Sequence, residues 1–308
     1  MNISFFEIFL ILAIVLFLFL LRPGKKAVVI DIICYPIKSC AGIHLERAEI
    51  EDLGIKNDRK WGIFLGKKVI SQIEEPKMLK LQPSFKYTST GIHSHLVLSY
   101  PGFADYYLSL SVKPSEDSSF NLEEVEGKYS DEGDSVAEWL LGVFGKPYRL
   151  GQLSKPRDLS KLSCFKEQNI KNQGLSFASE GQILITTFES FEDVKVNVPL
   201  QIRNKLNIQC FRPNIVIKHT NNYEEDKWGN FSIGECEFEG LKKCDRCRMT
   251  TLDSESFEFD PSCEPLNTLR KMHGDGIKGY FGLLAMRTKN GLVRVGDKVK
   301  VSSRVDRK

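Results

Sequence analysis

The sequence predicts an α+β protein whose main sheet is barrel-like. Runs rich in Val and Ile, typical of strands, occur at residues 27–35, 182–186, 214–218, 292–295 and 298–301. Helical patterns are few and do not alternate with the strands in a regular βα repeat, which disfavours a doubly wound parallel sheet. Hydrophobic residues make up 42% of the 308 residues and charged residues 27%, which is enough apolar material for a large core.

The first residues have the composition of a membrane anchor. Residues 3–21 are nearly all Ile, Leu, Phe, Val and Ala, with one charge at Glu7. A helix of this length comes close to the ~30 Å hydrocarbon core of a bilayer. The alternatives are a buried core helix and a cleaved signal peptide, but no basic region precedes the run and no small-x-small cleavage site follows it. Because the basic residues follow the run, from Arg22 on, the sequence predicts a signal anchor over 1–24 and a cytosolic remainder.

The elements after the first strand are predicted in chain order. Residues 96–100 and 107–112 are expected to form paired strands, connected through a Pro-Gly turn. Residues 135–144 have one apolar face and predict a helix, with Ser135 and Glu138 as a capping box at its start. The apolar face of this helix indicates core packing rather than a cofactor site.

The second half contains shorter predicted elements. A helical stretch opens at Thr187, and a short helix opens at Pro265 and ends near Met272. Residues 246–252 predict a further strand, and residues 296–297 a turn between the last two strands. We see no internal repeat.

Two domains are expected after the anchor, at 25–150 and 151–304. The stretch 113–134 is rich in Ser, Glu and Asp, and it predicts a loop close to the boundary. The charge balance is +3, from 43 Lys and Arg against 40 Asp and Glu, so no nucleic-acid partner is indicated. The eight cysteines follow no framework spacing, which indicates a reduced, cytosol-facing environment.

The densest unusual segment is 242–248, in which four cations surround Cys244 and Cys247. Such a field favours the thiolate, the form of cysteine that binds a metal. Three interpretations remain open: a zinc knuckle completed by Cys236 and Cys263, a single functional thiol, and unremarkable cysteines. A strand that begins by Cys244 would point the first two cysteines to opposite faces, which suits one functional thiol.

Four other places offer groups that bind anions. These are Lys38 and Ser39 in a Pro-bent loop, Arg59 beside a strand start, Arg212 at a strand entrance, and Thr186 with Thr187 at a helix N-terminus. Free N–H groups and the helix dipole favour phosphate at such a terminus. Each cation alone is most simply a solvated surface charge. The motifs of zinc proteases, α/β-hydrolases, Walker-type phosphate loops and Rossmann folds are absent from the sequence.

Taken together, these segments resemble the MOSC family, and specifically its mitochondrial amidoxime-reducing components. The resemblance covers most of residues 28–302 and includes the N-terminal anchor. Its motifs, in chain order, are Tyr35-Pro36-Ile37-Lys38-Ser39-Cys40, Asp58-Arg59-Lys60-Trp61, Phe211-Arg212-Pro213-Asn214-Ile215-Val216-Ile217, Cys244-Asp245-Arg246-Cys247, Glu264-Pro265-Leu266 and Val295-Gly296-Asp297. The implied fold is a MOSC-type mixed β-barrel core with an N-terminal MOSC β-rich subdomain, preceded by one transmembrane helix.

The resemblance also implies a molybdenum cofactor, Mo-molybdopterin. In such relatives the counterpart of Cys247 binds the metal through its sulfur, so Cys247 is the expected metal ligand and catalytic residue, and Cys244 is not a ligand. The counterparts of seven other residues are expected to hold the pterin and its phosphate: Lys38, Ser39, Arg59, Thr186, Thr187, Arg212 and Asn214.

The implied reaction is a two-electron reduction of small N-hydroxylated compounds (amidoximes, hydroxylamines and N-hydroxyguanidines) to amines or amidines. Electrons would come from NADH through cytochrome b5 reductase and cytochrome b5. The implied location is the mitochondrial outer membrane, with the catalytic domain facing the cytosol. Two alternatives are a non-catalytic carrier of the cofactor or of sulfur, since MOSC domains also occur fused to cofactor sulfurases, and a zinc-stabilised adaptor on a membrane.

The sequence departs from these relatives at two places. They carry Tyr-Ser-Asp-x-x-Pro before the cofactor-binding strand, whereas residues 177–182 here lack both the Asp and the Pro. The usual Ser-Glu at the end of that strand is Thr186-Thr187, so the hydroxyls remain and the carboxylate does not.

Overall fold

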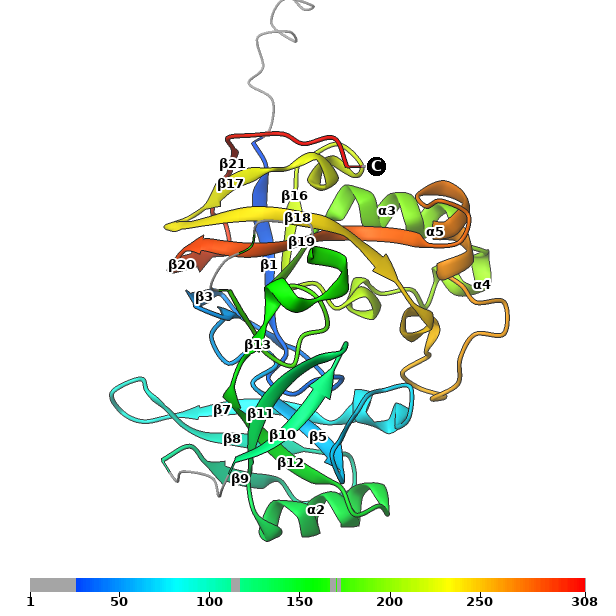
Figure 1. Cartoon of the computed structure of the whole chain (residues 1–308). Helices are drawn as coiled ribbons and strands as arrows, with labels where there is room; N and C mark the ends of the chain where they lie inside the picture. Colours follow the sequence, from blue (N-terminus) through cyan, green and yellow to red (C-terminus); the bar gives the residue numbers. More distant parts are fainter. Residues whose placement is uncertain (1–25, 112–116, 167–169, 171–172, 308) are drawn as a thin grey trace, which may run out of the picture.

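The computed structural model describes residues 26–111, 117–166, 170 and 173–307. These residues form mostly strands, with a large curled sheet in one half and a five-stranded sheet in the other (Figure 1). The predicted α+β class and strand-rich architecture are therefore confirmed. The predicted anchor over 1–24 lies outside the described residues. Within them, no helix has the length and apolar character needed to cross a membrane.

The large sheet has eight strands. Their order is β2 (Ile43–His44), β1 (Val28–Cys34), β16 (Ile215–Lys218), β15 (Ile183–Thr187), β19 (Gly279–Lys289), β18 (Cys236–Arg246), β17 (Asn230–Ile233) and β21 (Val299–Val301). Strands β15 and β16 are parallel and are joined through helix α3 (Phe188–Asn197), and the other neighbours are antiparallel. The predicted strands at 27–35, 182–186, 214–218 and 298–301 are all found in this sheet.

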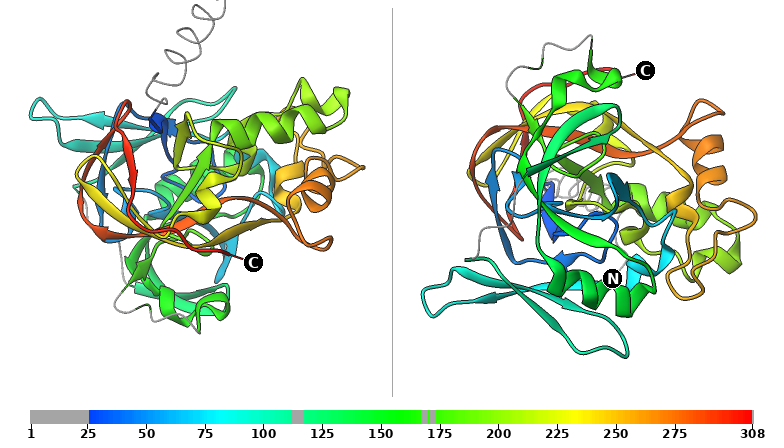
Figure 2. Two further views of the ribbon diagram at one scale, coloured as in Figure 1. Left: turned by 90° about the horizontal axis from the view of Figure 1, so that it is seen from above. Right: turned by 60° about the horizontal axis from the view of Figure 1, so that its bottom comes forward.

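The two ends of the large sheet approach each other. Val28 forms an antiparallel bridge with Lys298, and the Val29 amide donates to the Asp297 carbonyl at 2.9 Å. Two further views show the strands curling around a common interior (Figure 2). Buried Val, Ile, Phe and Trp side chains fill that interior, which accounts for the Val- and Ile-rich runs in the sequence.

The other half is built from two smaller sheets and a helix. The five-stranded sheet runs β10 (Asp117–Leu122), β11 (Val125–Asp131), β12 (Arg149–Lys155), β5 (Trp61–Leu65) and β6 (Lys68–Ile70), and the three-stranded sheet runs β7 (Gln82–Tyr87), β8 (His93–Ser99) and β9 (Tyr106–Ser109). Helix α2 (Asp134–Phe144) buries Val136 and Leu140 in the same apolar cluster as Leu96 and Leu98 of β8. Each such side chain contributes about 1.5–3 kcal/mol by burial.

The remaining elements are short. They are β3 (Arg47–Glu51), β4 (Gly54–Ile55), β13 (Arg157–Asp158), β14 (Gly174–Leu175), β20 (Gly291–Arg294), α4 (Leu200–Arg203), α5 (Leu266–Met272), and the 3-10 turns η1 (Pro76–Lys80), η2 (Leu159–Lys161), η3 (Ser163–Phe165), η4 (Ile208–Phe211), η5 (Glu224–Lys227) and η6 (Arg248–Thr251). Helix α5 begins after Pro265 and ends at Met272, as predicted. Strand β20 pairs with β3, so the turn at 296–297 does not close a hairpin between the last two strands.

Three local predictions were wrong. The stretch 113–134 is not all loop, because its described part contains the β10–β11 hairpin. Helix α2 has no side-chain cap, since its N-cap residue is Gly133 rather than Ser135. No strand forms over 246–252. Strand β18 ends at Arg246, and hydrogen bonds from the Thr250 and Thr251 hydroxyls to backbone carbonyls three residues earlier favour the 3-10 helix that follows. The domain boundary at 150 falls within β12 and stays a prediction.

Candidate functional site

The loop after β1 carries the first predicted anion-binding groups. Lys38 is anchored by its amide, which donates to the Trp61 carbonyl at 2.9 Å. Its ammonium donates to the Phe177 carbonyl and the Ser179 hydroxyl, both at 3.1 Å. Ser39 is buried and has a φ of 68°, a left-handed conformation that is uncommon for a residue other than Gly. The structure therefore joins Lys38 to the segment where the sequence departs from its relatives.

Two arginines from distant loops lie over one tyrosine. The guanidinium carbon of Arg59 is 4.4 Å from the centre of the Tyr35 ring, and that of Arg212 is 4.2 Å from it. Arg59 also donates to the Arg212 carbonyl at 3.3 Å. Both arginines have positive φ values, 47° and 55°, so the backbone holds them in conformations that cost energy. Such strain, where a fold maintains it, is typical of binding sites.

A buried polar network fixes these loops. The Asp58 carboxylate accepts from the Arg59 guanidinium at 2.6 Å, the Tyr35 amide at 2.8 Å and the Asn214 amide group at 3.0 Å. Asn214 also donates to the Ile33 carbonyl and accepts from the Leu184 amide. Because Asn214 satisfies donors and acceptors on β1 and β15 at once, it acts as a positioning residue.

The cations of this region outnumber the carboxylates paired with them: among the described residues Asp58 pairs with Arg59, whereas Lys38, Arg157 and Arg212 form no ion pair. Burial, with Arg157 and Arg59 nearby, lowers the pKa of Lys38 to about 7. Burial and the neighbouring Arg59 lower the pKa of Arg212 to about 10. Burial likewise lowers the pKa of Arg157 to about 10. Its guanidinium donates to backbone carbonyls, among them that of Ser176 at 3.0 Å. Four cationic side chains in one region are the electrostatic signature of an anion site.

Three buried polar atoms of residues in the predicted motifs and at the end of β15 have no hydrogen-bond partner among the described residues. They are Nη2 of Arg212, the hydroxyl of Tyr35 and Oγ1 of Thr186. Buried polar groups are almost always paired in native proteins, so unpaired ones point to a ligand. A phosphate-bearing ligand would pair the guanidinium and offer oxygens to the hydroxyls. The residues present therefore fit the anionic part of a pterin cofactor.

The two threonines at the end of β15 face different partners. Thr186 is on the same sheet face as Leu184, which packs against Cys244. Thr187 caps helix α3 and donates its hydroxyl to the Glu225 carboxylate at 3.0 Å, while its amide donates to the same carboxylate at 3.3 Å. Burial and the adjacent Asp226 raise the pKa of Glu225 to about 8. Since Glu225 takes the hydrogen bonds expected to go to phosphate, Thr187 is not available to a ligand, whereas the buried Thr186 hydroxyl has no hydrogen-bond partner.

The two cysteines of the basic segment differ in exposure. Cys247 is exposed and directly follows β18, whereas Cys244 is buried against Leu184. Arg246 lies between them: its guanidinium donates to the Cys244 sulfur at 2.8 Å and to the Phe211 carbonyl at 2.8 Å. Phe211 precedes Arg212, so Arg246 connects the Cys247 segment to the arginine loop.

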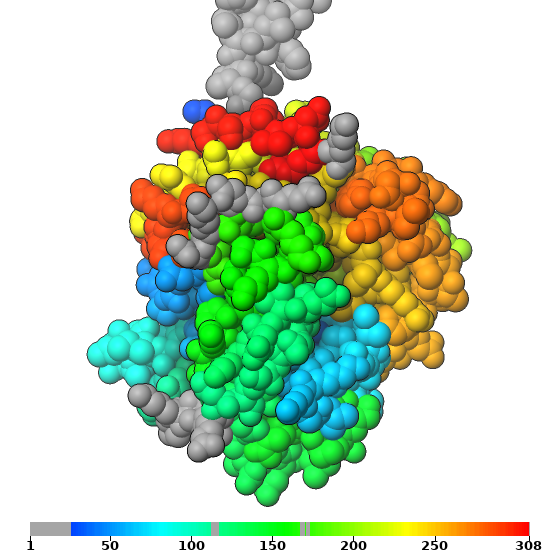
Figure 3. Space-filling view, in the orientation of Figure 1, coloured from blue at the N-terminus to red at the C-terminus, as the bar shows by residue number. Residues whose placement is uncertain are grey.

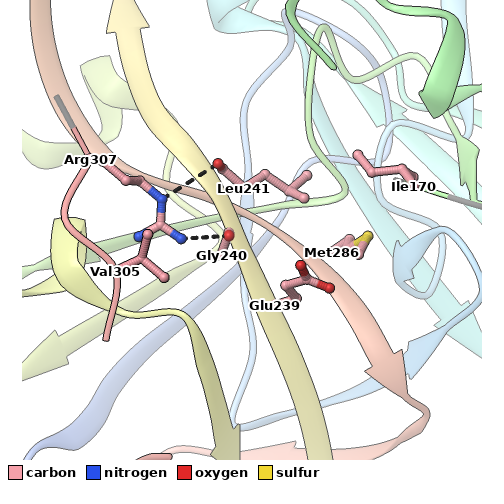
Figure 4. A pocket seen from close by; sticks show the side chains of 7 residues that line it. All are labelled: Ile170, Glu239, Gly240, Leu241, Met286, Val305 and Arg307. Atoms are coloured by element: carbon pink, nitrogen blue, oxygen red, sulfur yellow. Dashed lines mark hydrogen bonds between the residues drawn. The ribbon is translucent and has the colours of Figure 1, made fainter. Parts of the chain in front are cut away.

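Two other features do not form the site. Among the described residues, no group of three or more His, Cys, Asp or Glu side chains is placed to hold a metal ion, which leaves the zinc-knuckle interpretation without support. A pocket of about 470 Å³ lies beside the middle of β18 and contains none of the predicted site residues (Figure 4). It is lined by Ile170, Glu239, Gly240, Leu241, Met286, Val305 and Arg307.

Sequence reasoning missed several residues of this site. Tyr35 and Asp58 lie inside two of the sequence motifs, but the sequence predicts only other residues of those motifs as ligand-binding residues. Arg157 and Glu225 gave no signal, because each is a charged residue whose burial is visible only in the fold. Arg246 was counted as one of four local cations, and its contact with Phe211 depends on the approach of η4 to β18.

The comparison with protein families agrees with this two-part architecture. Residues 26–147 match the MOSC N-terminal beta barrel domain, and residues 172–300 match the MOSC domain. The chain belongs to the MOSC domain family, which confirms the predicted resemblance.

Similar proteins include amidoxime-reducing components and cofactor sulfurases. The chain is 29% identical over 283 residues to mitochondrial amidoxime reducing component 2 of Rattus norvegicus, covering 86% of this chain and 80% of that protein. It is 27% identical to molybdenum cofactor sulfurase of Arabidopsis thaliana, covering 82% of this chain and 32% of that protein. A crystal structure of the YUAD protein from Bacillus subtilis is similar over 89% of this chain and 94% of its own, with 10% identity and a TM-score of 0.41.

Proposed function

We propose that this protein is a molybdenum-cofactor reductase of small N-hydroxylated compounds such as amidoximes, hydroxylamines and N-hydroxyguanidines. Cys247 would bind the metal, and Lys38, Arg59 and Arg212 would hold the phosphate of the pterin. Ser39, Thr186 and Asn214 complete the proposed set, with Thr187 acting only through the helix it caps. When bound, the cofactor would supply the two electrons that cleave the N–O bond.

The observation that carries this proposal is the pair of arginines over Tyr35. Arg212 keeps a buried donor unpaired, and Arg59 over the same ring adds a second cation, which favours an anionic ligand at this site. The link from Arg246 to the Phe211 carbonyl joins that site to an exposed thiol. The similarity to proteins named mitochondrial amidoxime reducing component supports the reductase assignment.

The partners and the location belong to the same proposal. Electrons would come from NADH through cytochrome b5 reductase and cytochrome b5. An anchor over 1–24 would hold the protein in the mitochondrial outer membrane, with residues 25–308 in the cytosol. The word mitochondrial in the names of the relatives supports the organelle.

The metal content of the purified chain tests the proposal. Produced in a host that synthesises the pterin, the wild type should carry about one molybdenum per chain, and Cys247→Ser should carry none. Cys244→Ser is the matched control, because its thiol is buried and faces Arg246 rather than a ligand. Molybdenum retained by Cys247→Ser, with amidoxime reduction intact, would overturn the assignment.

A second candidate is a non-catalytic carrier of the cofactor or of sulfur. The match to molybdenum cofactor sulfurase favours it, since that match covers 82% of this chain. A carrier would bind the cofactor, or hold a persulfide at Cys247, without turnover when NADH, the reductase and cytochrome b5 are supplied. Amidoxime reduction that depends on Cys247 distinguishes the two.

A further inference from the structure

An exposed arginine directly follows the proposed metal ligand. The guanidinium carbon of Arg248 is 4.1 Å from the centre of the Phe259 ring. A guanidinium stacked on an aromatic ring loses less freedom when it binds a carboxylate than an unsupported side chain does. Arg248 is therefore a cation held in one place, one residue after Cys247 in the chain.

The ring beneath Arg248 is itself held in place. Phe259 forms a backbone bridge with Leu252, and the Asp260 amide donates to the Thr251 carbonyl at 2.8 Å. Residues 248–263 also reach the other half of the protein, since Gln72 donates to the Met249 carbonyl at 3.3 Å. Figure 3 shows this gold to orange segment at the surface beside the blue atoms of the N-terminal half.

Two carboxylates of the same loop pair with other cations. Asp253 pairs with Lys205 at 3.5 Å, and Glu255 pairs with Lys80 at 3.1 Å. Within the part of the chain that the structure describes, no carboxylate oxygen lies within 4 Å of the Arg248 guanidinium. Cations outside the loop thus pair with two of its acids, and Arg248 is left available.

Arg246, on the other side of Cys247, is not available in this way. Its guanidinium is taken up by the Phe211 carbonyl and the Cys244 sulfur. Of the two arginines that flank the cysteine, one therefore faces inward to the loop of Arg212, and the other faces solvent.

We propose that Arg248 is a specificity-determining residue that gives this site a preference for N-hydroxylated substrates carrying a carboxylate. The stacked guanidinium would donate to the carboxylate while the N–O group faces the metal held by Cys247. This inference rests on the proposed function for the reaction, but it also predicts binding, which needs no turnover.

The test compares two probes that differ by one carboxylate, benzamidoxime and 4-carboxybenzamidoxime, on the cofactor-loaded full chain. Calorimetry gives the affinity of each probe, and steady-state kinetics gives kcat/KM. Arg248→Met should lower the affinity for the carboxylate probe about fivefold and leave benzamidoxime unchanged. Arg248→Lys and Phe259→Leu should each lower it partly, since one removes the planar fork and the other removes its support.

Arg47→Met is the control, because it removes the same charge from an exposed strand position on β3. Equal affinities of wild type and Arg248→Met for the carboxylate probe overturn the inference, whatever the activity. Anion-selective binding that is lost in Arg248→Met, with no turnover of either probe, supports the inference and overturns the reductase assignment instead. If both probes are turned over and the ratio of their kcat/KM values is the same in the wild type and in Arg248→Met, only the inference is overturned.

Discussion

Arg59 and Arg212, from loops more than a hundred residues apart, both contact Tyr35, with their guanidinium carbons 4.4 and 4.2 Å from its ring centre. The ring stabilises each guanidinium by a cation–π contact, but it carries no negative charge that could neutralise them. The one carboxylate of the network, Asp58, is bonded to Arg59 and not to Arg212. Arg212 is therefore placed for a ligand, and its unpaired, buried guanidinium lowers the stability of the ligand-free protein. This loss of stability can be measured.

Arg212→Met should leave the ligand-free protein as stable as the wild type or more stable by about 1 kcal/mol. The reason is that the substitution removes a buried, unpaired donor and its repulsion with Arg59. The same variant should lose stabilisation by sulfate, a dianion at all working pH values. Thermal denaturation with and without sulfate measures both effects.

Arg149→Met serves as the comparison for this experiment. Arg149 pairs with Asp131 and with Asp134, so its removal should lower stability by about 0.5 kcal/mol and leave the response to sulfate unchanged. A loss of several kcal/mol in Arg212→Met would mean that Arg212 is a structural residue.

Asn214→Ala should destabilise the protein by about 2–3 kcal/mol. Asn214 is 2% exposed, and its removal leaves the Leu184 amide and the Ile33 carbonyl without their side-chain partner. Chemical denaturation measures the loss. Asn204→Ala, at the exposed end of α4, should change the free energy of unfolding by less than about 0.5 kcal/mol. A wild-type value for Asn214→Ala would show that the network does not hold the loops.

The sequence predicts some strands of the large sheet well, but it does not predict the strands that pair with them. The Val- and Ile-rich runs at β1, β15 and β16 are largely buried and carry a strong local signal. Strand β18 contains seven charged or glycine residues among its hydrophobic ones, so it does not resemble a buried strand in sequence, and β19 carries an apolar run that was not predicted as a strand. Long-range pairing makes them strands, and that pairing is not encoded in any short window.

The same limit applies to the site. The motifs with Lys38, Arg59 and Arg212 can be found in the sequence because each is a cation beside Pro, Asp or a strand start. Thr187 has the residue type expected for a phosphate contact, yet Glu225 occupies its hydroxyl. A buried acid from a segment 38 residues away can be located only in three dimensions.

Sulfate affinity should fall about tenfold between pH 6 and pH 8. Burial and the nearby arginines lower the pKa of Lys38 to about 7, so its charge is present at pH 6 and largely lost at pH 8. An anion binds the protonated form more tightly, so binding weakens as the pH rises. Calorimetry across this range measures the profile, and Lys38→Met should bind sulfate weakly with a flat profile. A flat profile in the wild type would contradict the assignment of Lys38.

Glu225→Gln should gain stability relative to the wild type as the pH rises from 5 to 8. Burial raises the folded-state pKa of Glu225 to about 8, from an ordinary value near 4.5. Below 4.5 the carboxyl is protonated in both states, and stability is fully present. Between 4.5 and 8 the unfolded chain releases the proton and the folded chain keeps it, so wild-type stability falls as the pH rises.

The side-chain amide that Glu225→Gln introduces would keep an acceptor for the Thr187 backbone amide and would never ionise. The variant should therefore escape this loss, by a difference on the order of a few kcal/mol at pH 8. Chemical denaturation at several pH values measures it. Glu224→Gln is the matched control, because hydrogen bonds with Asn221 and the Arg304 guanidinium lower the pKa of Glu224. This control should show no gain with rising pH. Parallel curves for the wild type and Glu225→Gln would show that Glu225 ionises in the folded state, and that the cap of α3 is an ordinary charged one.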